Sequence, residues 1–221
     1  MKIQLHMLLS TKLLAPYGKN SRYVSLPSRM RYAHPHVAIG IEQLILRFGK
    51  VFLTDCYRDP AASLLARSTK RGVQKPGYSA HNFGLAIDLD VAKMLRVCGY
   101  KKADLDYKMN QYGFRCYRAD HKADAPEAWH YTFSAKSPGQ EAVEEVIQSY
   151  YGSRFKLDAH GVQEALVALR LYAGTIDGKH GPLTRTALGL FQRTWGLAET
   201  QKADEATQRL LAVVTADKEI V

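Results

Sequence analysis

Residues Ser79–Asp90 read SAHNFGLAIDLD, which joins a histidine, a glycine and two acidic residues to an otherwise apolar run. The short, mostly apolar run LAIDLD predicts a buried β-strand. One interpretation of its carboxylates is structural, because Asp88 and Asp90 lie two apart and would both point to solvent from one face of the strand. The other interpretation is that Asp88 and His81 face a common site.

A second histidine, His130, follows far downstream in PEAWHYTF. Two imidazoles and one carboxylate suit a Zn²⁺ ion that keeps a fourth coordination position open. Such an ion lowers the pKa of water towards about 7 and polarises a carbonyl, which is hydrolytic chemistry. Glu127 lies three residues before His130, close enough to take a proton from that water and pass it to a leaving amine. Spacing alone keeps the alternative open, since a histidine beside a tryptophan is more often a packed side chain than a ligand.

Other residues with metal-binding side chains fit this role less well. His34 and His36 form an HxH pair with no carboxylate nearby in sequence, so we interpret them as surface or helix-entry residues. His121 and its acidic neighbours in RADHKADAPEAWH either orient a ligand or form a solvated charged loop. The chain has three cysteines: Cys56, Cys98 and Cys116. They form no CxxC pair and their number is odd, so we expect buried thiols rather than a disulfide framework.

Composition and charge bound the possible partners. Of the 221 residues, 46% are hydrophobic and 24% charged, and the formal net charge is +10. Residues 155–221 hold eight Lys and Arg against eight Asp and Glu, so the whole excess lies in residues 1–154. This excess favours an anionic partner, although a solvated basic face explains it equally well. No segment approaches the ~20 apolar residues that span a bilayer. The N-terminus lacks the pattern of a Sec signal, so we expect synthesis in a cytoplasm and no membrane insertion.

Hydrophobic periodicity predicts elements along the first two thirds of the chain. They are a helix over 35–48, a strand in VFLTDCYRDP, a surface loop within 61–78, the strand LAIDLD, a helix ending near 112, the strand HYTF and a helix over 140–152. Strands and helices mix without the regular alternation of a parallel sheet, which indicates an α+β domain.

The last third has a different pattern. GVQEALVALRLYAG, LTRTALGLFQRTWGL and DEATQRLLAVVT are amphipathic and are joined by glycine-containing turns. They predict a small three-helix bundle without an evident internal repeat. We therefore expect two domains, residues 1–152 and 153–221.

The opening stretch carries a family resemblance. SAHNFGLAID resembles the SxHxxGxAxD signature of zinc DD-carboxypeptidases and VanY/VanX-type peptidases, whose relatives include phage L-alanyl-D-glutamate endolysins. EAWH is similar to their second signature, ExxH with a Trp before the His. The resemblance implies a DD-peptidase/hedgehog-like catalytic domain with a small central antiparallel sheet and flanking helices. It also implies that His81, Asp88 and His130 bind Zn²⁺ and that Glu127 is the catalytic base.

Further roles follow from the same resemblance. Arg58 matches the family arginine that lies against the scissile carbonyl or a substrate carboxylate, and the alternative is an ion pair with Asp59 or another acid that stabilises the turn. Ser79 either binds substrate or caps the local turn. Gly84 permits a close backbone approach or a positive φ. The chain reads TDCYRDP where many relatives have Ser-Gly-Tyr-Arg-Ser, a departure that concerns the specificity pocket more than the metal.

The bundle region carries a second resemblance. VQEAL, IDGKHGPLTRTAL and FQRTWGL, within residues 157–197, resemble the peptidoglycan-binding domain of cell-wall hydrolases. The resemblance implies that this domain binds glycan or stem peptide, with Tyr172, His180 and Arg185 as candidate contacts.

Together the two resemblances imply a zinc-dependent peptidoglycan endopeptidase of the endolysin kind. It would cut L-Ala-D-Glu or a cross-link as a monomer at the bacterial cell wall, after release from the host cytoplasm. One alternative is a D-Ala-D-Ala carboxypeptidase. Another is a cell-wall-binding protein with an inactive zinc domain, against which the presence of Glu127 argues. Nucleic-acid binding rests on charge alone and is not expected.

Overall fold

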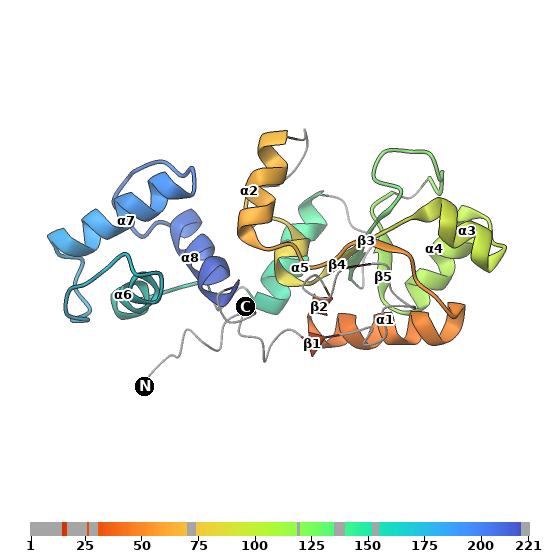
Figure 1. Ribbon diagram of the computed structural model, residues 1–221, viewed down its shortest axis with the longest axis horizontal. Helices are drawn as coiled ribbons and strands as arrows, with labels where there is room; N and C mark the ends of the chain where they lie inside the picture. The colour runs from red at the N-terminus through yellow and green to blue at the C-terminus, as the bar shows by residue number, and fades with distance from the viewer. Residues whose placement is uncertain are drawn as a thin grey trace. The chain divides into compact units, whose positions relative to one another are not determined.

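Figure 1 shows the computed structural model, which describes residues 15–16, 26, 31–69, 74–118, 120–134, 140–151 and 155–217. These residues form two compact units. The sheet unit holds the described residues of 14–59 and 78–150, and the bundle unit holds those of 60–77 and 151–221. The basic N-terminal segment of the sequence lies largely outside the described residues.

The sheet unit is built on four short strands. They are β3 (Leu53–Asp55), β4 (Ala86–Leu89), β5 (Phe114–Cys116) and β6 (His130–Phe133). All neighbours are antiparallel, in the order β3-β4-β6-β5, which confirms the α+β class and the small antiparallel sheet. Every residue of β4 is buried, so the interpretation that Asp88 points to solvent is wrong.

Helices accompany this sheet. The α-helices of the region are α1 (Pro35–Phe48), α3 (Val91–Cys98), α4 (Lys102–Gln111) and α5 (Gln140–Tyr151), and a pair of two-residue strands, β1 (Ala15–Pro16) and β2 (Tyr32–Ala33), precedes them. Helix α1 begins with Pro35, where a missing N–H costs no hydrogen bond, and ends before Gly49 at φ 73°. The predictions for α1, α4, α5, β4 and β6 are confirmed, whereas the sequence did not predict α3 or β5.

The segment predicted to include a surface loop, 61–78, begins with a helix. Helix α2 (Pro60–Thr69) occupies its first part and belongs to the bundle unit. The buried side chain of Arg209 holds the other end of this segment, because its Nε donates a hydrogen bond to the Gly77 carbonyl. The same guanidinium lies 4.9 Å from the ring centroid of Phe155. Gly77 is thus fastened to the helix Glu205–Asp217.

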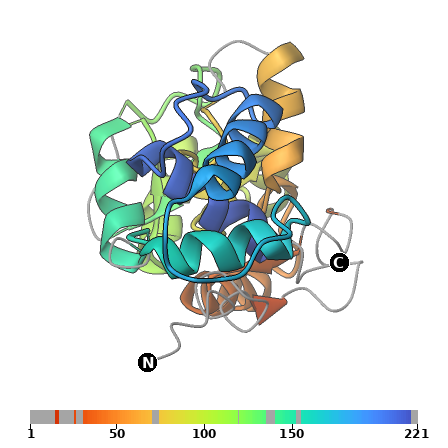
Figure 2. The same ribbon diagram turned by 90° about the vertical axis from the view of Figure 1, so that its left-hand side faces the viewer.

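The bundle unit contains the predicted three helices, α6 (Ala159–Ala168), α7 (Pro182–Thr194) and α8 (Glu205–Asp217) (Figure 2). One apolar cluster lies between them: Val162, Ala165, Leu166, Ala187, Leu188, Phe191, Leu210, Leu211 and Val214. The prediction of a small three-helix bundle is confirmed. In the part of the chain that the structure describes, no helix is long and apolar enough to cross a membrane.

Two buried glutamines repeat one arrangement within the bundle. The amide nitrogen of Gln163 donates to a backbone carbonyl in the following turn and, at 3.1 Å, to Thr184 Oγ1. The amide nitrogen of Gln192 does the same in the next turn, with Thr207 Oγ1 at 2.9 Å. This repeat is not evident in the sequence because the two turns differ in length and share few residue types.

Candidate metal centre

Three segments bring His81, Asp88 and His130 together. His81 lies on η3 (Ala80–Phe83), Asp88 on β4 and His130 on β6. Asp88 and His130 are register partners across the antiparallel pair, which places their side chains side by side on one face of the sheet. The next residues on that face are Ala86, which is small, and Thr132. The sheet therefore supplies two of the three groups and η3 supplies the third.

Local backbone features present His81 to the sheet. Ser79 Oγ accepts a hydrogen bond from the His81 amide at 3.3 Å, so Ser79 caps η3. Capping the local turn was one of the two roles predicted for Ser79. Gly84 ends η3 at φ 62°, in the left-handed region. A Cβ at Gly84 would lie 2.8 Å from both Ala33 Cα and His34 N, closer than atoms pack. Gly84 thus provides both the positive φ and the close backbone approach expected of it.

The three donor atoms form a small triangle. His81 Nε2 lies 3.3 Å from Asp88 Oδ1, and His130 Nδ1 lies 2.8 Å from the same oxygen. The two nitrogens are 3.2 Å apart. Zinc bonds of 2.0–2.1 Å in a tetrahedron place neighbouring ligand atoms about 3.3–3.4 Å apart. The triangle therefore has nearly the size of one face of a tetrahedral zinc site, and these residues fit that ion.

The second nitrogen of each imidazole has its own partner. His81 Nδ1 lies 2.6 Å from the backbone carbonyl of Cys56. Because a carbonyl only accepts, Nδ1 carries the proton and Nε2 presents its lone pair to the triangle. His130 Nε2 lies 3.2 Å from Thr132 Oγ1, which leaves Nδ1 for the triangle. Such partners fix the tautomer and orientation of metal-binding histidines.

Burial and charge shape the titration of the cluster. His81 is 3% exposed and Asp88 9%. Burial alone lowers the pKa of His81, but the Asp88 carboxylate outweighs it and raises that pKa above the ordinary 6.5. Burial likewise disfavours the Asp88 carboxylate, yet the two histidines bring its pKa far below the ordinary value. The triangle therefore stabilises positive charge at its centre, as a cation site must.

Arg58 lies beside His81 and is paired with an acid. Its amide donates to the His81 carbonyl at 3.2 Å. Its Nε donates to Asp55 Oδ2 at 2.9 Å, and Nη2 donates to the same oxygen. Asp55 Oδ1 accepts the Cys56 amide at 2.9 Å. The ion pair anticipated as an alternative for Arg58 thus exists, with Asp55 rather than Asp59.

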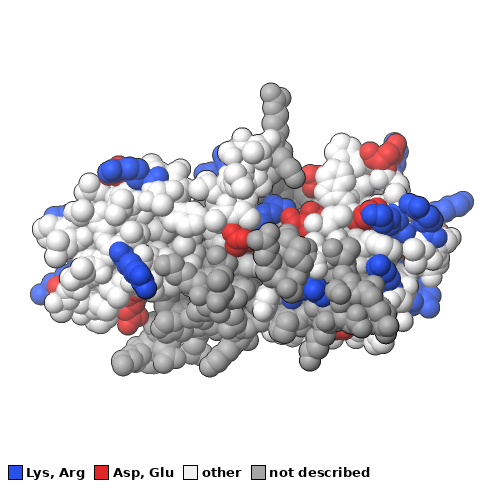
Figure 3. Space-filling model, in the orientation of Figure 1, with Lys and Arg blue, Asp and Glu red and all other residues white. Residues whose placement is uncertain are grey.

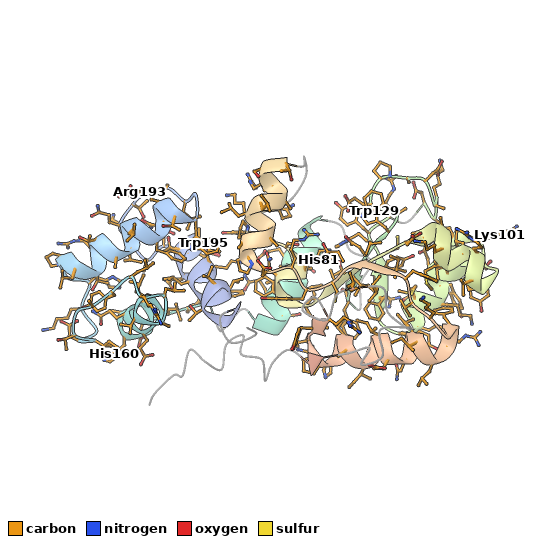
Figure 4. All side chains as sticks on the ribbon, viewed as in Figure 1. His81, Lys101, Trp129, His160, Arg193 and Trp195 are labelled. Atoms are coloured by element: carbon orange, nitrogen blue, oxygen red, sulfur yellow. The ribbon has the colours of Figure 1, made fainter. Side chains whose placement is uncertain are left out.

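Glu127 occupies a strained turn directly before β6. Its φ is 61°, a region that costs a residue other than glycine about 1–2 kcal/mol. The turn is closed by the His130 amide, which donates to the Glu127 carbonyl at 3.0 Å. Within the described part of the chain, the exposed Glu127 carboxylate makes no hydrogen bond or ion pair. Figure 4 labels the neighbouring Trp129, which is 41% exposed, together with the buried His81.

Other candidates have partners away from the triangle. Asp90, which the sequence did not assign to the metal, accepts the Lys93 amide at 3.0 Å and so caps α3. His34 caps α1, in agreement with a helix-entry role. His121 Nδ1 lies 2.8 Å from Asp106 Oδ2, and its side chain is half exposed. All three cysteines are free thiols. Figure 3 shows acidic side chains among the Lys and Arg over α3 and α4, as on a solvated charged surface.

Sequence reasoning missed three contributors to the site. Thr132 could have been found, because it lies two residues after His130 on a strand and so shares its face. Asp55 could have been proposed as a neighbour of Arg58, but its spacing favoured no partner over Asp59. The Cys56 carbonyl had no signal at all, since every residue carries one.

The three candidate wall contacts in the bundle unit differ in their surroundings. Tyr172 Oη donates to the Thr175 carbonyl at 2.8 Å and accepts from Gln163 Nε2 at 3.3 Å, so its hydroxyl holds a turn together. His180 and Arg185 are exposed, as wall contacts must be. Their role as contacts stays a prediction.

Comparison with known proteins supports one part of this interpretation. Residues 158–211 match a family model described as "Putative peptidoglycan binding domain". The "Putative OxPP cycle protein OpcA" of Synechococcus elongatus is 47% identical over 49 residues, which are 22% of this chain and 11% of that protein. Among solved structures, the LdcB LD-carboxypeptidase, described in terms of peptidoglycan recognition, aligns with a TM-score of 0.43 and 18% identity over 64% of this chain and 74% of that one.

The family match confirms the resemblance noted for the bundle region. It supports a peptidoglycan-related function and peptidoglycan as a partner. This chain spans only 11% of the length of the curated relative, so that protein's activity has no bearing on the site.

Proposed function

We propose that the protein is a zinc-dependent peptidase that hydrolyses an amide bond in the stem peptide of bacterial peptidoglycan. The observation that carries the proposal is the donor triangle of His81, Asp88 and His130, with sides of 2.8 to 3.3 Å. Its second nitrogens are already held by Cys56 and Thr132. The peptidoglycan-binding family match at residues 158–211 supports the choice of polymer.

The residues of the triangle hold the ion and set its surroundings. A bound Zn²⁺ would supply Lewis acidity, which lowers the pKa of water towards about 7 and polarises a carbonyl. His81 and His130 each offer one nitrogen while the other stays hydrogen-bonded, so neither ring has to turn to bind. The buried position of Asp88 keeps its carboxylate out of bulk water.

Glu127 and Arg58 would carry the proton and the charge. The Glu127 carboxylate, without a partner among the described residues, accepts a proton from the attacking water and gives it to the leaving amine nitrogen. Arg58, held against the His81 carbonyl by its own amide, donates a hydrogen bond to the oxygen on which negative charge develops. Glu127 thus handles the water and its proton, and Arg58 handles the peptide oxygen.

The bundle unit would hold the enzyme on its polymer. Binding to the wall raises the local concentration of cleavable peptides around the sheet unit without a new contact at the active site. Because both motif resemblances point to wall-degrading enzymes, we extend the proposal to an endolysin-like endopeptidase. It would be made in a host cytoplasm and act at the wall as a monomer.

The test is release of new amino termini from purified peptidoglycan by the zinc-loaded full chain. Glu127→Gln should abolish this release while zinc content and sedimentation with walls stay unchanged. Asp124→Asn, an exposed acid in the same loop, is the matched control and should retain activity. Full activity in Glu127→Gln would refute the mechanism. A wild-type protein that is loaded with zinc but releases nothing would identify a binding protein with an inactive domain.

Mass spectrometry of the digest then identifies the bond. Cleavage between L-Ala and D-Glu, or at a cross-link, supports an endopeptidase. Release of free D-Ala alone would instead identify a carboxypeptidase.

A further inference from the structure

Tyr117 continues the pairing of β5 with β6 by one residue. Cys116 is the register partner of Tyr131, and the next amide, that of Tyr117, donates to the His130 carbonyl at 2.9 Å. Because residues opposite each other in an antiparallel pair have their side chains on one face, Tyr117 shares the face of His130. The rings confirm this, since their centroids are 6.1 Å apart at an interplanar angle of 74°. Tyr117 therefore lies beside the metal triangle, although neither sequence motif contains it.

Tyr117 extends a row of residues that already holds two of the three metal-binding groups. Asp55 of β3 pairs with Asp88 of β4, and Asp88 pairs with His130 of β6. Tyr117 adds the fourth position of this row, next to His130. At the opposite end, Asp55 holds Arg58 through their ion pair. The two strand-borne ligands thus lie between the Arg58–Asp55 pair and Tyr117.

The hydroxyl of Tyr117 is the part of this side chain that the protein leaves unused. It has no hydrogen-bond partner within the part of the chain that the structure describes. The hydroxyls of Tyr131 and Tyr172, in contrast, donate to other groups of the protein. The Tyr117 side chain is only partly buried, so a ligand can reach it from solvent. Its amide and ring are already held against His130, which lowers the entropy that binding would cost.

The chemistry of a phenol suits a peptide group. A tyrosine hydroxyl donates one hydrogen bond without adding a charge, and a backbone carbonyl accepts one. The row has the right length for a peptide, because three steps between neighbouring strands span roughly 14 Å. About four residues of extended chain cover that distance.

We propose that Tyr117 is a further substrate-binding residue, whose hydroxyl donates a hydrogen bond to a backbone carbonyl of the stem peptide on the side of the triangle away from Arg58. This inference rests on the proposed peptidase function and adds a contact that the two motifs do not supply. The peptide lies along the row, with Arg58 and Tyr117 on either side of the bond that is cut.

The experiment measures peptide binding at the metal itself. The full chain carries Glu127→Gln and is loaded with Co²⁺ in place of Zn²⁺, so its visible absorption responds to a ligand at the triangle and not to binding by the bundle unit. The probe is L-Ala-γ-D-Glu-L-Lys-D-Ala-D-Ala, which is long enough to span the row. Its dissociation constant should rise about five- to tenfold in Tyr117→Phe, which removes only the hydroxyl, while cobalt content and thermal midpoint stay unchanged.

Matched variants separate this contact from packing. Tyr107→Phe removes a hydroxyl from an exposed tyrosine on α4 and should leave the dissociation constant unchanged. Tyr117→Leu removes the ring as well, so any additional loss of cobalt in this variant measures the packing against His130. The inference is overturned by an unchanged dissociation constant or a loss of cobalt in Tyr117→Phe, by an equal rise in Tyr107→Phe, or by a cobalt spectrum that does not respond to the peptide.

The outcome is independent of hydrolysis. If the zinc-loaded protein with Glu127 intact cleaves nothing and Tyr117→Phe still weakens binding, the proposed function fails and the assignment of Tyr117 stands. If hydrolysis occurs and the dissociation constant does not move, the function stands and the assignment of Tyr117 fails.

Discussion

The buried network behind the metal triangle should be a main source of stability for the sheet unit. Tyr131 lies between His130 and Thr132 on β6, so its side chain points to the opposite face of the sheet. Its hydroxyl donates to Asp106 Oδ1 at 2.6 Å, and Lys102 Nζ donates to the same oxygen at 2.5 Å. Burial and Asp106 raise the pKa of Tyr131, which keeps this donor protonated.

Replacing Asp106 with alanine would leave a buried ammonium without its carboxylate. The Lys102 side chain is 4% exposed, so water cannot substitute for the lost partner. The neighbouring Cys116 Sγ, 3.3 Å from Lys102 Nζ, offers no charge in exchange, because burial raises the pKa of its thiol. Breaking a buried ion pair from one side costs about 3–5 kcal/mol. At about 4 °C per kcal/mol, the thermal midpoint should fall by roughly 12–20 °C.

The assay is calorimetric or circular-dichroism melting of the full chain, with urea unfolding for the free energy. Asp104→Ala removes an exposed acid from the same helix and should cost less than about 1 kcal/mol. Lys102→Met combined with Asp106→Leu removes both charges and should recover most of the loss. A loss below about 1 kcal/mol for Asp106→Ala, or a double variant as unstable as the single one, would refute the reasoning.

Three further predictions concern the donor triangle, the glycine that ends η3 and the bundle unit. In metal-free protein the ion pair of His81 and Asp88 stabilises the fold most between pH 3.8 and 6.5, and this stability is lost as pH rises through the raised pKa of His81. Melting with EDTA at pH 5.5 and 8 measures the loss, and Asp88→Asn is the control whose melting temperature should not depend on the ion pair. Gly84→Ala should cost about 2–4 kcal/mol and lower zinc content, whereas Gly99→Ala, at φ 69° in open space, should cost only about 1–2 kcal/mol in the same urea titration. Gln163→Ala removes the side chain that holds the turn over 177–184, and should destabilise the bundle unit by about 2–4 kcal/mol in calorimetry.

The fold was predictable where the signal was local. The short apolar run in LAIDLD and the 3.6-residue pattern of 35–48 are local patterns that tertiary contacts reinforced. Helix α3 was missed because it has only eight residues and two buried side chains. Its ends were nevertheless marked, since Asp90 caps it and Gly99 ends it at φ 69°.

The side chains of the site could be predicted from the sequence, but the groups that orient them could be predicted less well. His81, Asp88 and His130 were named from two motifs, and the register of two strands brings them together. The Cys56 carbonyl that orients His81 could not have been named, because the choice among backbone carbonyls is made by tertiary structure. The partner of Arg58 was equally open, since Asp55 and Asp59 are both near in sequence and only the turn conformation decides between them.

The segment Asp55–Arg58 gives a final test, because it supports both the metal triangle and the substrate side of the site. Burial lowers the pKa of His81, Asp88 and then Asp55 raise it, and Arg58 lowers it. Asp55→Asn should therefore let zinc persist to lower pH, since protons compete less well for His81. Arg58→Gln should have the opposite sign, with zinc lost at higher pH than in wild type. The midpoint of zinc release during acid titration, read with a chelating dye, measures both shifts, and two shifts in the same direction would show that the segment acts on His81 through structure rather than charge.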